Sequence, residues 1–228
     1  AVTSVTVTPT VAMTDATWVW LRMRLDLTNG ANSVATLETA ADAGDNVEPS
    51  SWTANGTNTG TTIAGLFDST APLEIGTFAS GTSERLSGRV GRCIVRSGIA
   101  GTTVADFNAD DCFGDGYLHT DGYVWTVGNP KIYDRSTNLR APVVAAAGSN
   151  APAPLPWGGT PSVYLPGTAG NAISTPHAAS HDITGDIEIV ANVVLSSVTV
   201  AQRIVSRGTA SWAMFITSSN TLGLAFRF

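Results

Sequence analysis

Hydrophobic and polar residues alternate along much of the chain with a period of two, which is typical of β-strands. The clearest stretch is residues 17–28, which the pair Asn29-Gly30 follows. Its apolar positions are Val19, Leu21, Met23, Leu25 and Leu27, and the positions between them are Trp18, Trp20, Arg22, Arg24 and Asp26. Because successive side chains of a strand point to opposite faces, the pattern predicts a strand with one buried and one outer face, ended by a turn.

Shorter segments of the same kind recur about every ten residues, with Gly, Pro, Asn and Asp between them. We expect strands at 34–39, 51–54, 71–76, 87–96, 102–107, 124–127, 162–165, 186–194, 202–207, 212–217 and 222–228, and one that contains Val2, Val5 and Val7. Residues 108–122 are acidic and contain Gly, and we expect a loop there. Many short strands without a convincing helix predict an all-β protein, an antiparallel β-sandwich or a jelly roll.

Composition also favours strands. Hydrophobic residues make up 43 % of the 228 residues and charged residues 13 %, with abundant Thr, Ala, Gly and Val. Long surface helices would need more Glu and Lys, whereas Thr and Val pack well on a pleated sheet.

Charge and hydropathy restrict the partners. The formal net charge is −6, and the basic residues are Lys131 and scattered Arg, so no cluster is available to displace phosphate counterions. We therefore expect no nucleic-acid partner. No apolar run approaches the length of a bilayer span and no signal peptide is visible, so we expect no membrane insertion.

Residues 141–160 differ from the rest of the chain because they are rich in Pro, Gly and Ala. Proline supplies no backbone donor to a β-ladder, so this segment is predicted to be a linker or an extended crossover. The predicted organisation is therefore 1–140, a linker at 141–160, and 161–228.

Two groups of short motifs carry a family resemblance. The first is Leu73-Glu74-Ile75-Gly76, then Leu86-Ser87-Gly88-Arg89-Val90 followed by Val95-Arg96; the second is Tyr164-Leu165-Pro166-Gly167, Ile173-Ser174-Thr175-Pro176 and Asp182-Ile183-Thr184-Gly185-Asp186-Ile187-Glu188-Ile189. The first group resembles the closing strands, and the second the opening strands, of concanavalin A-like, laminin-G-like jelly rolls. Together they are similar to modules in tail and other virion proteins of actinobacterial phages.

The order of these motifs implies the closing half of one module at 1–140 and the opening half of a second, similar module at 161–228. A half-sandwich alone would expose an apolar sheet face and unpaired edges. The missing half is expected from sequence outside this chain, from the other end of the chain, or from a neighbouring chain. The chain does not begin with Met and stops within an apolar segment, 222–228, so we expect that residue 1 is not the start of the gene product. Either both ends belong to a longer tandem array, or the two halves complement one another in a permuted or exchanged arrangement.

The outer face of 17–28 offers a candidate ligand site. Its residues Trp18, Trp20, Arg22 and Arg24 form an aromatic and cationic stripe. In a lectin-like sandwich, sugar rings would stack on the indoles of such a stripe. The alternative is that the indoles pack under a loop or a partner, with a guanidinium against a ring. Trp157 in the linker and Trp52 are candidates of the same kind.

The acidic segment suggests a calcium loop, because hard cations need several close oxygen atoms. Its candidate ligands are Asp106, Asn108, Asp110 and Asp111, with Asp115 beyond them. The pattern departs from the EF-hand, which needs Gly at the position of Asp111 and Glu at that of Tyr117. A solvated acidic turn is the alternative, and calcium is the one cofactor considered.

Catalytic candidates fit their chemistry poorly. Ser180-His181-Asp182 has the residue types of a hydrolase triad, but neighbouring strand residues point apart, so a polar turn is expected. Two carboxylate pairs, Glu74/Glu84 and Asp186/Glu188, could flank a glycosidic bond, although a solvated outer face also explains them. His119, His177 and His181 lack metal-site spacing. We expect no enzyme activity.

The two cysteines, Cys93 and Cys112, fit neither a zinc site nor a disulfide-rich scaffold. They could form one bridge between adjacent strands, or remain two free thiols that are partly buried.

The resemblance implies a structural or adhesion protein of a bacteriophage virion, in a tail, a fibre or the capsid exterior. Its partners would be other virion proteins, copies of itself and a host cell-surface glycan. The alternative is a secreted bacterial carbohydrate-binding module attached to an adhesin or hydrolase. A glucanase-like enzyme is a third hypothesis, because one fold hosts all three functions.

Overall fold

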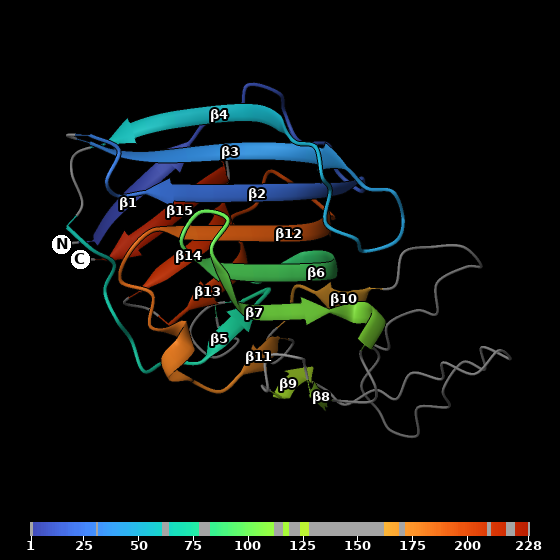
Figure 1. Ribbon diagram of the computed structural model, residues 1–228. Coiled ribbons are helices and arrows are strands. Elements are labelled where there is room, and N and C mark those ends of the chain that lie inside the picture. Colours follow the sequence, from blue (N-terminus) through green and yellow to red (C-terminus); the bar gives the residue numbers. More distant parts are fainter. Residues whose placement is uncertain are drawn as a thin grey trace, which may run out of the picture.

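The computed structural model describes residues 2–30, 32–60, 64–77, 83–111, 116–118, 124–127, 162–168, 172–208, 211–217 and 222–227. These residues form two antiparallel sheets that pack face to face, with two single-turn 3-10 helices, η1 (Ala109–Asp111) and η2 (Ala179–His181) (Figure 1). The predicted all-β class and antiparallel β-sandwich are confirmed. The described residues contain no helix with the length and apolarity that crossing a membrane requires.

The seven-stranded sheet faces the viewer in Figure 1 and has the order β10-β6-β12-β2-β3-β4, with β7 also paired to β6. Its strands are β2 (Trp18–Asp26), β3 (Ser33–Ala41), β4 (Thr53–Gly60), β6 (Ser87–Ser97), β7 (Thr102–Asn108), β10 (Val163–Pro166) and β12 (Ile187–Leu195).

The eight-stranded sheet lies behind it and has the order β1-β15-β14-β13-β5-β11-β9-β8. Its strands are β1 (Val2–Val7), β5 (Leu73–Ile75), β8 (Gly116–Leu118), β9 (Val124–Val127), β11 (Ile173–Thr175), β13 (Gln202–Arg207), β14 (Trp212–Ile216) and β15 (Leu222–Arg227).

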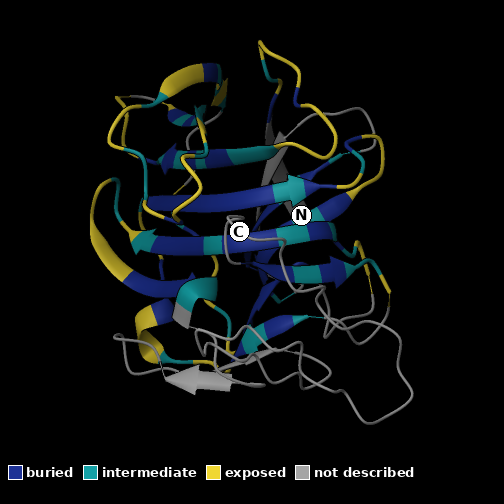
Figure 2. Cartoon of the chain, turned by 90° about the vertical axis from the view of Figure 1, so that its right-hand side faces the viewer, coloured by how far each residue is buried: buried dark blue, intermediate teal, exposed yellow. Residues whose placement is uncertain are grey.

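The hydrophobic core lies between the two sheets and follows the predicted alternation. On β2, Leu21, Met23 and Leu25 are fully buried in one apolar cluster with Ile187 and Ile189 of β12. Figure 2 shows the buried residues concentrated in the strands and the exposed ones in the connections. The predicted inner face of residues 17–28 is therefore correct.

Both sheets contain strands from both ends of the chain. In the seven-stranded sheet, β12 lies between β2 and β6. In the other sheet, β1 pairs with β15, and Val2 lies opposite Arg227. Residues 162–227 therefore complete the sheets begun by residues 2–127 within one chain. The predicted linker, 141–160, lies outside the described residues.

Two strand predictions need correction. Residues 108–122 were expected to be a loop, but β8 lies within them. The strand expected at 51–54 runs as β4 to Gly60 through a sequence rich in Gly and Asn. This edge strand is held by the β1–β2 connection, because the Asn55 side chain accepts a hydrogen bond from the Val11 amide at 2.6 Å and donates to its carbonyl at 3.2 Å. Tertiary contacts thus override weak strand propensity here.

The Cys93 thiol is free and buried in the core, and burial raises its pKa. The predicted alternative of a bridge to Cys112 is therefore not formed. Cys112 itself lies outside the described residues.

The interleaved topology predicts that the order of the two parts of the chain can be exchanged. A circular permutant that starts at residue 161, with the original ends joined by about four residues, should fold with near-native stability. The reason is that β1 and β15 are already paired antiparallel, so the new connection would close them into a hairpin. Urea unfolding followed by Trp fluorescence would measure it. A permutant that fails to unfold cooperatively would contradict this topology.

Candidate functional site

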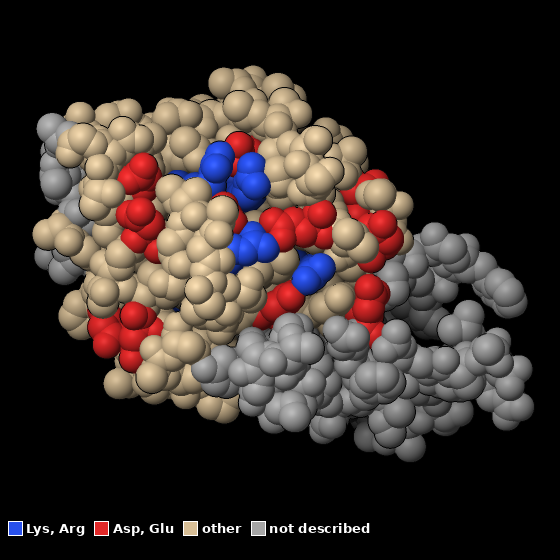
Figure 3. All heavy atoms as spheres, in the orientation of Figure 1, with Lys and Arg blue, Asp and Glu red and all other residues tan. Residues whose placement is uncertain are grey.

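The outer face of the seven-stranded sheet collects the charged and aromatic residues that the sequence singled out. Strand register arranges them in rows that cross the sheet. One row is Arg96, Glu188, Arg24 and Thr36; the next is Ile94, Val190, Arg22 and Glu38; the third is Arg92, Asn192, Trp20 and Ala40. Figure 3 shows acidic and basic side chains gathered in a band across this face.

Ion pairs order the first two rows. Glu38 lies between two guanidinium groups, with Arg22 Nε and Arg24 Nη2 each 2.6 Å from its carboxylate oxygens. Arg96 bridges Glu188, at 2.7 Å, and Glu48. The hydrogen bond to Glu48 is the main reason that the pKa of Arg96 is raised. Because the Glu188 side chain is 3 % exposed, loss of Arg96 would leave a buried and unpaired carboxylate.

The β3–β4 connection, residues 42–52, covers the third row. Trp20 is fully buried beneath it and donates from Nε1 to Asp42 at 3.1 Å. Trp20, Ile94 and Val190 form a second, smaller apolar cluster on this side of the sheet, and Trp52 packs against it. The guanidinium of Arg22 stacks on the Trp52 ring, 4.3 Å from its centroid. In this arrangement the Trp20 ring offers no surface to a ligand.

Asn46 fixes this connection to the sheet. Asn46 has a left-handed backbone, with φ 52°, and a side chain that is almost fully buried. Its Oδ1 accepts from Asn192 Nδ2 at 3.1 Å, and its Nδ2 donates to Asp110 at 3.1 Å. Arg92 donates to its carbonyl oxygen at 3.1 Å. Gly91, on the bulge of β6, leaves the space for this side chain, since a Cβ there would lie 2.2 Å from Asn46 Oδ1.

The candidate calcium ligands lie beside this anchor and bond mainly to protein groups. Asp106 receives two hydrogen bonds from Arg92, at 2.9 and 2.6 Å, and these are the main reason that the pKa of Arg92 is raised. Asn108 Oδ1 accepts from the Asp110 amide at 3.1 Å. Within the described part of the chain, no three His, Cys, Asp or Glu residues cluster in a way that could hold a metal ion. The Asp111 side chain and Asp115 lie outside the described residues.

The residues predicted for ligand binding are thus separated by the structure. Trp18 is half-buried at the start of β2, Trp20 is covered, and Arg22 and Arg24 share Glu38. Trp157 lies outside the described residues. The roles of Asp42, Asn46 and Asn192 have no local sequence signal, because their contacts join strands and a connection that are far apart in sequence.

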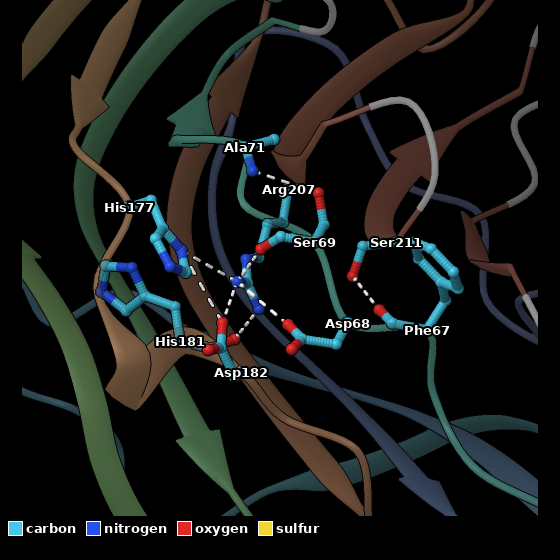
Figure 4. A network of polar contacts seen from close by, with 9 residues as sticks. All are labelled: Phe67, Asp68, Ser69, Ala71, His177, His181, Asp182, Arg207 and Ser211. Atoms are coloured by element: carbon cyan, nitrogen blue, oxygen red, sulfur yellow. Dashed lines mark hydrogen bonds and ion pairs between the residues drawn. The ribbon is translucent and has the colours of Figure 1, made fainter.

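A second polar cluster surrounds Arg207 at the end of β13 (Figure 4). Its guanidinium is fully buried and bonds to the carboxylates of Asp182 and, at 3.4 Å, Asp68. It also donates to the carbonyl oxygens of Ser69 and His181. The cluster therefore ties the segments 64–72 and 176–186 to the end of β13.

The predicted polar turn Ser180-His181-Asp182 belongs to this cluster and not to a triad. His181 is 1 % exposed, and burial, then the charges of Arg207 and His177, lower its pKa to about 4. Burial opposes ionisation of Asp182, but the hydrogen bond and the charge of Arg207 leave its pKa below the usual value. His177 lies 3.1 Å from Arg207 and 3.7 Å from Asp182. The guanidinium of Arg207 thus lies at the centre of these His and Asp side chains, where a triad would need its reacting groups.

The two candidate carboxylate pairs also have other partners. Glu188 pairs with Arg96, and Glu84 pairs with Arg203. Asp186 accepts a hydrogen bond from the Leu27 amide at 2.8 Å, and Glu74 is buried on β5. Ionic or backbone partners thus engage Glu188, Glu84 and Asp186.

No protein-family model matches the chain, and a search of curated proteins also finds no match. The class that the described residues define is therefore an antiparallel β-sandwich with a charge-paired outer sheet face. The jelly-roll family that the motifs resemble stays a prediction.

Gly91→Ala should detach the 42–52 connection from the sheet. The new methyl group would collide with the buried Asn46 amide, and such overpacking costs about 1–3 kcal/mol. Acrylamide quenching of Trp fluorescence should rise as Trp20 becomes accessible. Gly185→Ala is the matched control, since a Cβ there meets nothing within 4 Å. Equal quenching in both variants would contradict the anchoring role of Asn46.

Stability should decrease in mild acid because of His181. Its pKa is about 4 in the folded chain, against 6.5 for the free side chain, so between these values the unfolded state binds more protons. The contribution of His181 to the free energy of unfolding should therefore have its full value above pH 6.5. The free energy of unfolding should fall by up to about 3 kcal/mol as the pH decreases towards 4. Urea unfolding at several pH values would measure the slope. His181→Gln should reduce this slope, and an unchanged slope would refute its assignment to His181.

Proposed function

We propose that this chain is an adhesive structural module of a bacteriophage particle, and that the outer face of its seven-stranded sheet contacts a host cell-surface glycan. The observation that carries the glycan contact is the placement of half-buried aromatic side chains on that face, Trp18 on β2 and Tyr164 on β10. Amphipathic rings of this kind supply contact area at little entropic cost.

Rigidity of the face supports the proposal. The ion pairs of Glu38, Glu188 and Asp106 hold neighbouring strands at fixed geometry, and the Asn46 anchor holds the connection over them. A face that is ordered before binding loses little conformational entropy on contact. These same pairings use carboxylates and guanidinium groups for structure, which favours binding by shape over chemistry.

The virion setting is supported by the resemblance of the sequence motifs to actinobacterial phage modules. Weak single sites suit such a setting, because many copies on one particle gain avidity without a tight individual contact. The particle would supply the copies, and the sheet face would supply the contact.

Two measurements test this proposal. Antibodies against the chain should label the exterior of purified particles by immunogold electron microscopy, and label on a secreted hydrolase would replace the virion setting with the secreted one. The chain displayed on multivalent beads should bind isolated actinobacterial cell-wall polysaccharide, and Trp18→Ala should weaken this binding about tenfold or more, a loss of about 1.4 kcal/mol.

Thr59→Ala is the control, since Thr59 is exposed on the edge strand β4 of the same sheet and should leave binding unchanged. Absence of polysaccharide binding by the multivalent chain would overturn the adhesive role.

A further inference from the structure

A fourth row of outward side chains crosses the same sheet beside the row that contains Trp20. It consists of Tyr164 on β10, Arg89 on β6, Val194 on β12 and Trp18 on β2, joined by the strand registers. Their chain neighbours Val163, Leu165, Val90, Val193 and Leu195 point into the core. All four side chains of the row are half-buried.

The row has the length of a short oligomer. Adjacent strands lie about 4.8 Å apart, so its two aromatic ends, Trp18 and Tyr164, are separated by about 14 Å. The row is one residue wide, and Asp42, which bonds to Trp20 and Asn192, marks the start of the 42–52 connection beside it. A stable protein partner would need about 800 Å² on this side, so a narrow linear chain fits the row better than a folded domain.

Arg89 differs from the other arginines of this face. Arg22, Arg24, Arg92 and Arg96 each have a carboxylate within 3 Å. Arg89 instead contacts the Ser162 hydroxyl at 3.5 Å and the face of the Tyr164 ring, 5.5 Å from its centroid, and has no carboxylate partner among the described residues. Because Arg89 has no carboxylate partner in the part of the chain that the structure describes, its planar guanidinium is suited to bind a ligand carboxylate through paired hydrogen bonds.

We propose that this row binds an acidic oligosaccharide. A sugar carboxylate pairs with Arg89, and sugar rings pack on Trp18 and Tyr164 on either side. The inference rests on the proposed glycan contact and adds to it the class of the ligand, a uronic-acid-containing chain, and the residue that selects it.

The test uses pairs of polysaccharide fragments that differ in charge alone: oligogalacturonate and hyaluronan oligosaccharides, and their carboxyl-reduced forms. Isothermal titration calorimetry of the native chain should give at least tenfold tighter binding to the acidic member of a pair, and the difference should shrink as salt rises. Arg89→Gln should abolish the difference between the two forms. Arg89→Lys should restore part of it, because Lys keeps the charge but not the planar fork.

Trp18→Ala separates stacking from charge recognition, since it should weaken binding to both forms by the same factor. Thermal unfolding of each variant checks that the sandwich is intact. Equal binding of acidic and reduced fragments, with loss in Trp18→Ala, would overturn the selection by Arg89 and leave the glycan contact standing. Binding of polyglutamate as tightly as of the uronate chain would also overturn the inference, and binding of no saccharide would overturn both proposals.

Discussion

The position of β12 is the constraint on which the rest of the structure depends. Eight of its nine residues are buried, and it separates β2 from β6 although it follows them by about 170 and 100 residues. Its inner side chains fill the space between the sheets. Its outer side chains Glu188, Val190 and Asn192 bind Arg96, support Trp20 and hold Asn46. Because side chains alternate, a slip by one residue would exchange these two sets, so the core and the polar face are fixed together.

This dependence has a kinetic side. The seven-stranded sheet cannot be completed until β12, from the C-terminal part of the chain, pairs with β2 and β6, which precede it in the sequence by many residues. Non-local pairings of this kind carry a large loop-closure entropy, and folding dominated by them is slow. Until β12 pairs with them, β2 and β6 each have an edge without a hydrogen-bonded neighbour. Such unpaired edges favour association with other chains.

Local patterns were sufficient for part of the fold and for little of the candidate site. The alternation in 17–28 identified β2 and its inner face, because period two depends on neighbouring residues alone. It could not show that residues 42–52 cover Trp20 while Trp18 stays half-buried, since the covering segment belongs to another part of the chain. Tyr164 and Arg89 were likewise missed as partners. Period two in 162–165 places Tyr164 on an outer face, but in 87–96 it would group Arg89 with the buried Cys93 and Val95. The bulge at Gly91 turns Arg89 outward, and this bulge and the register that joins Arg89 to Tyr164 are tertiary properties. The length of strand β4 was underestimated for a similar reason, because the hydrogen bonds of Asn55 to Val11 compensate for the low strand propensity of its Gly and Asn residues.

The pairing of β1 with β15 has a mechanical consequence. Val2 and Arg227 lie opposite each other at one end of this antiparallel ladder, so a force on the two ends of the chain acts on the sheet at one place (Figure 1). A force that separates them acts on the hydrogen bonds one after another, starting at that end, instead of loading all of them in parallel. Peeling of this kind requires little force. Under tension the sandwich would therefore open first between β1 and β15, while β12, which is paired on both sides by β2 and β6, would remain in place.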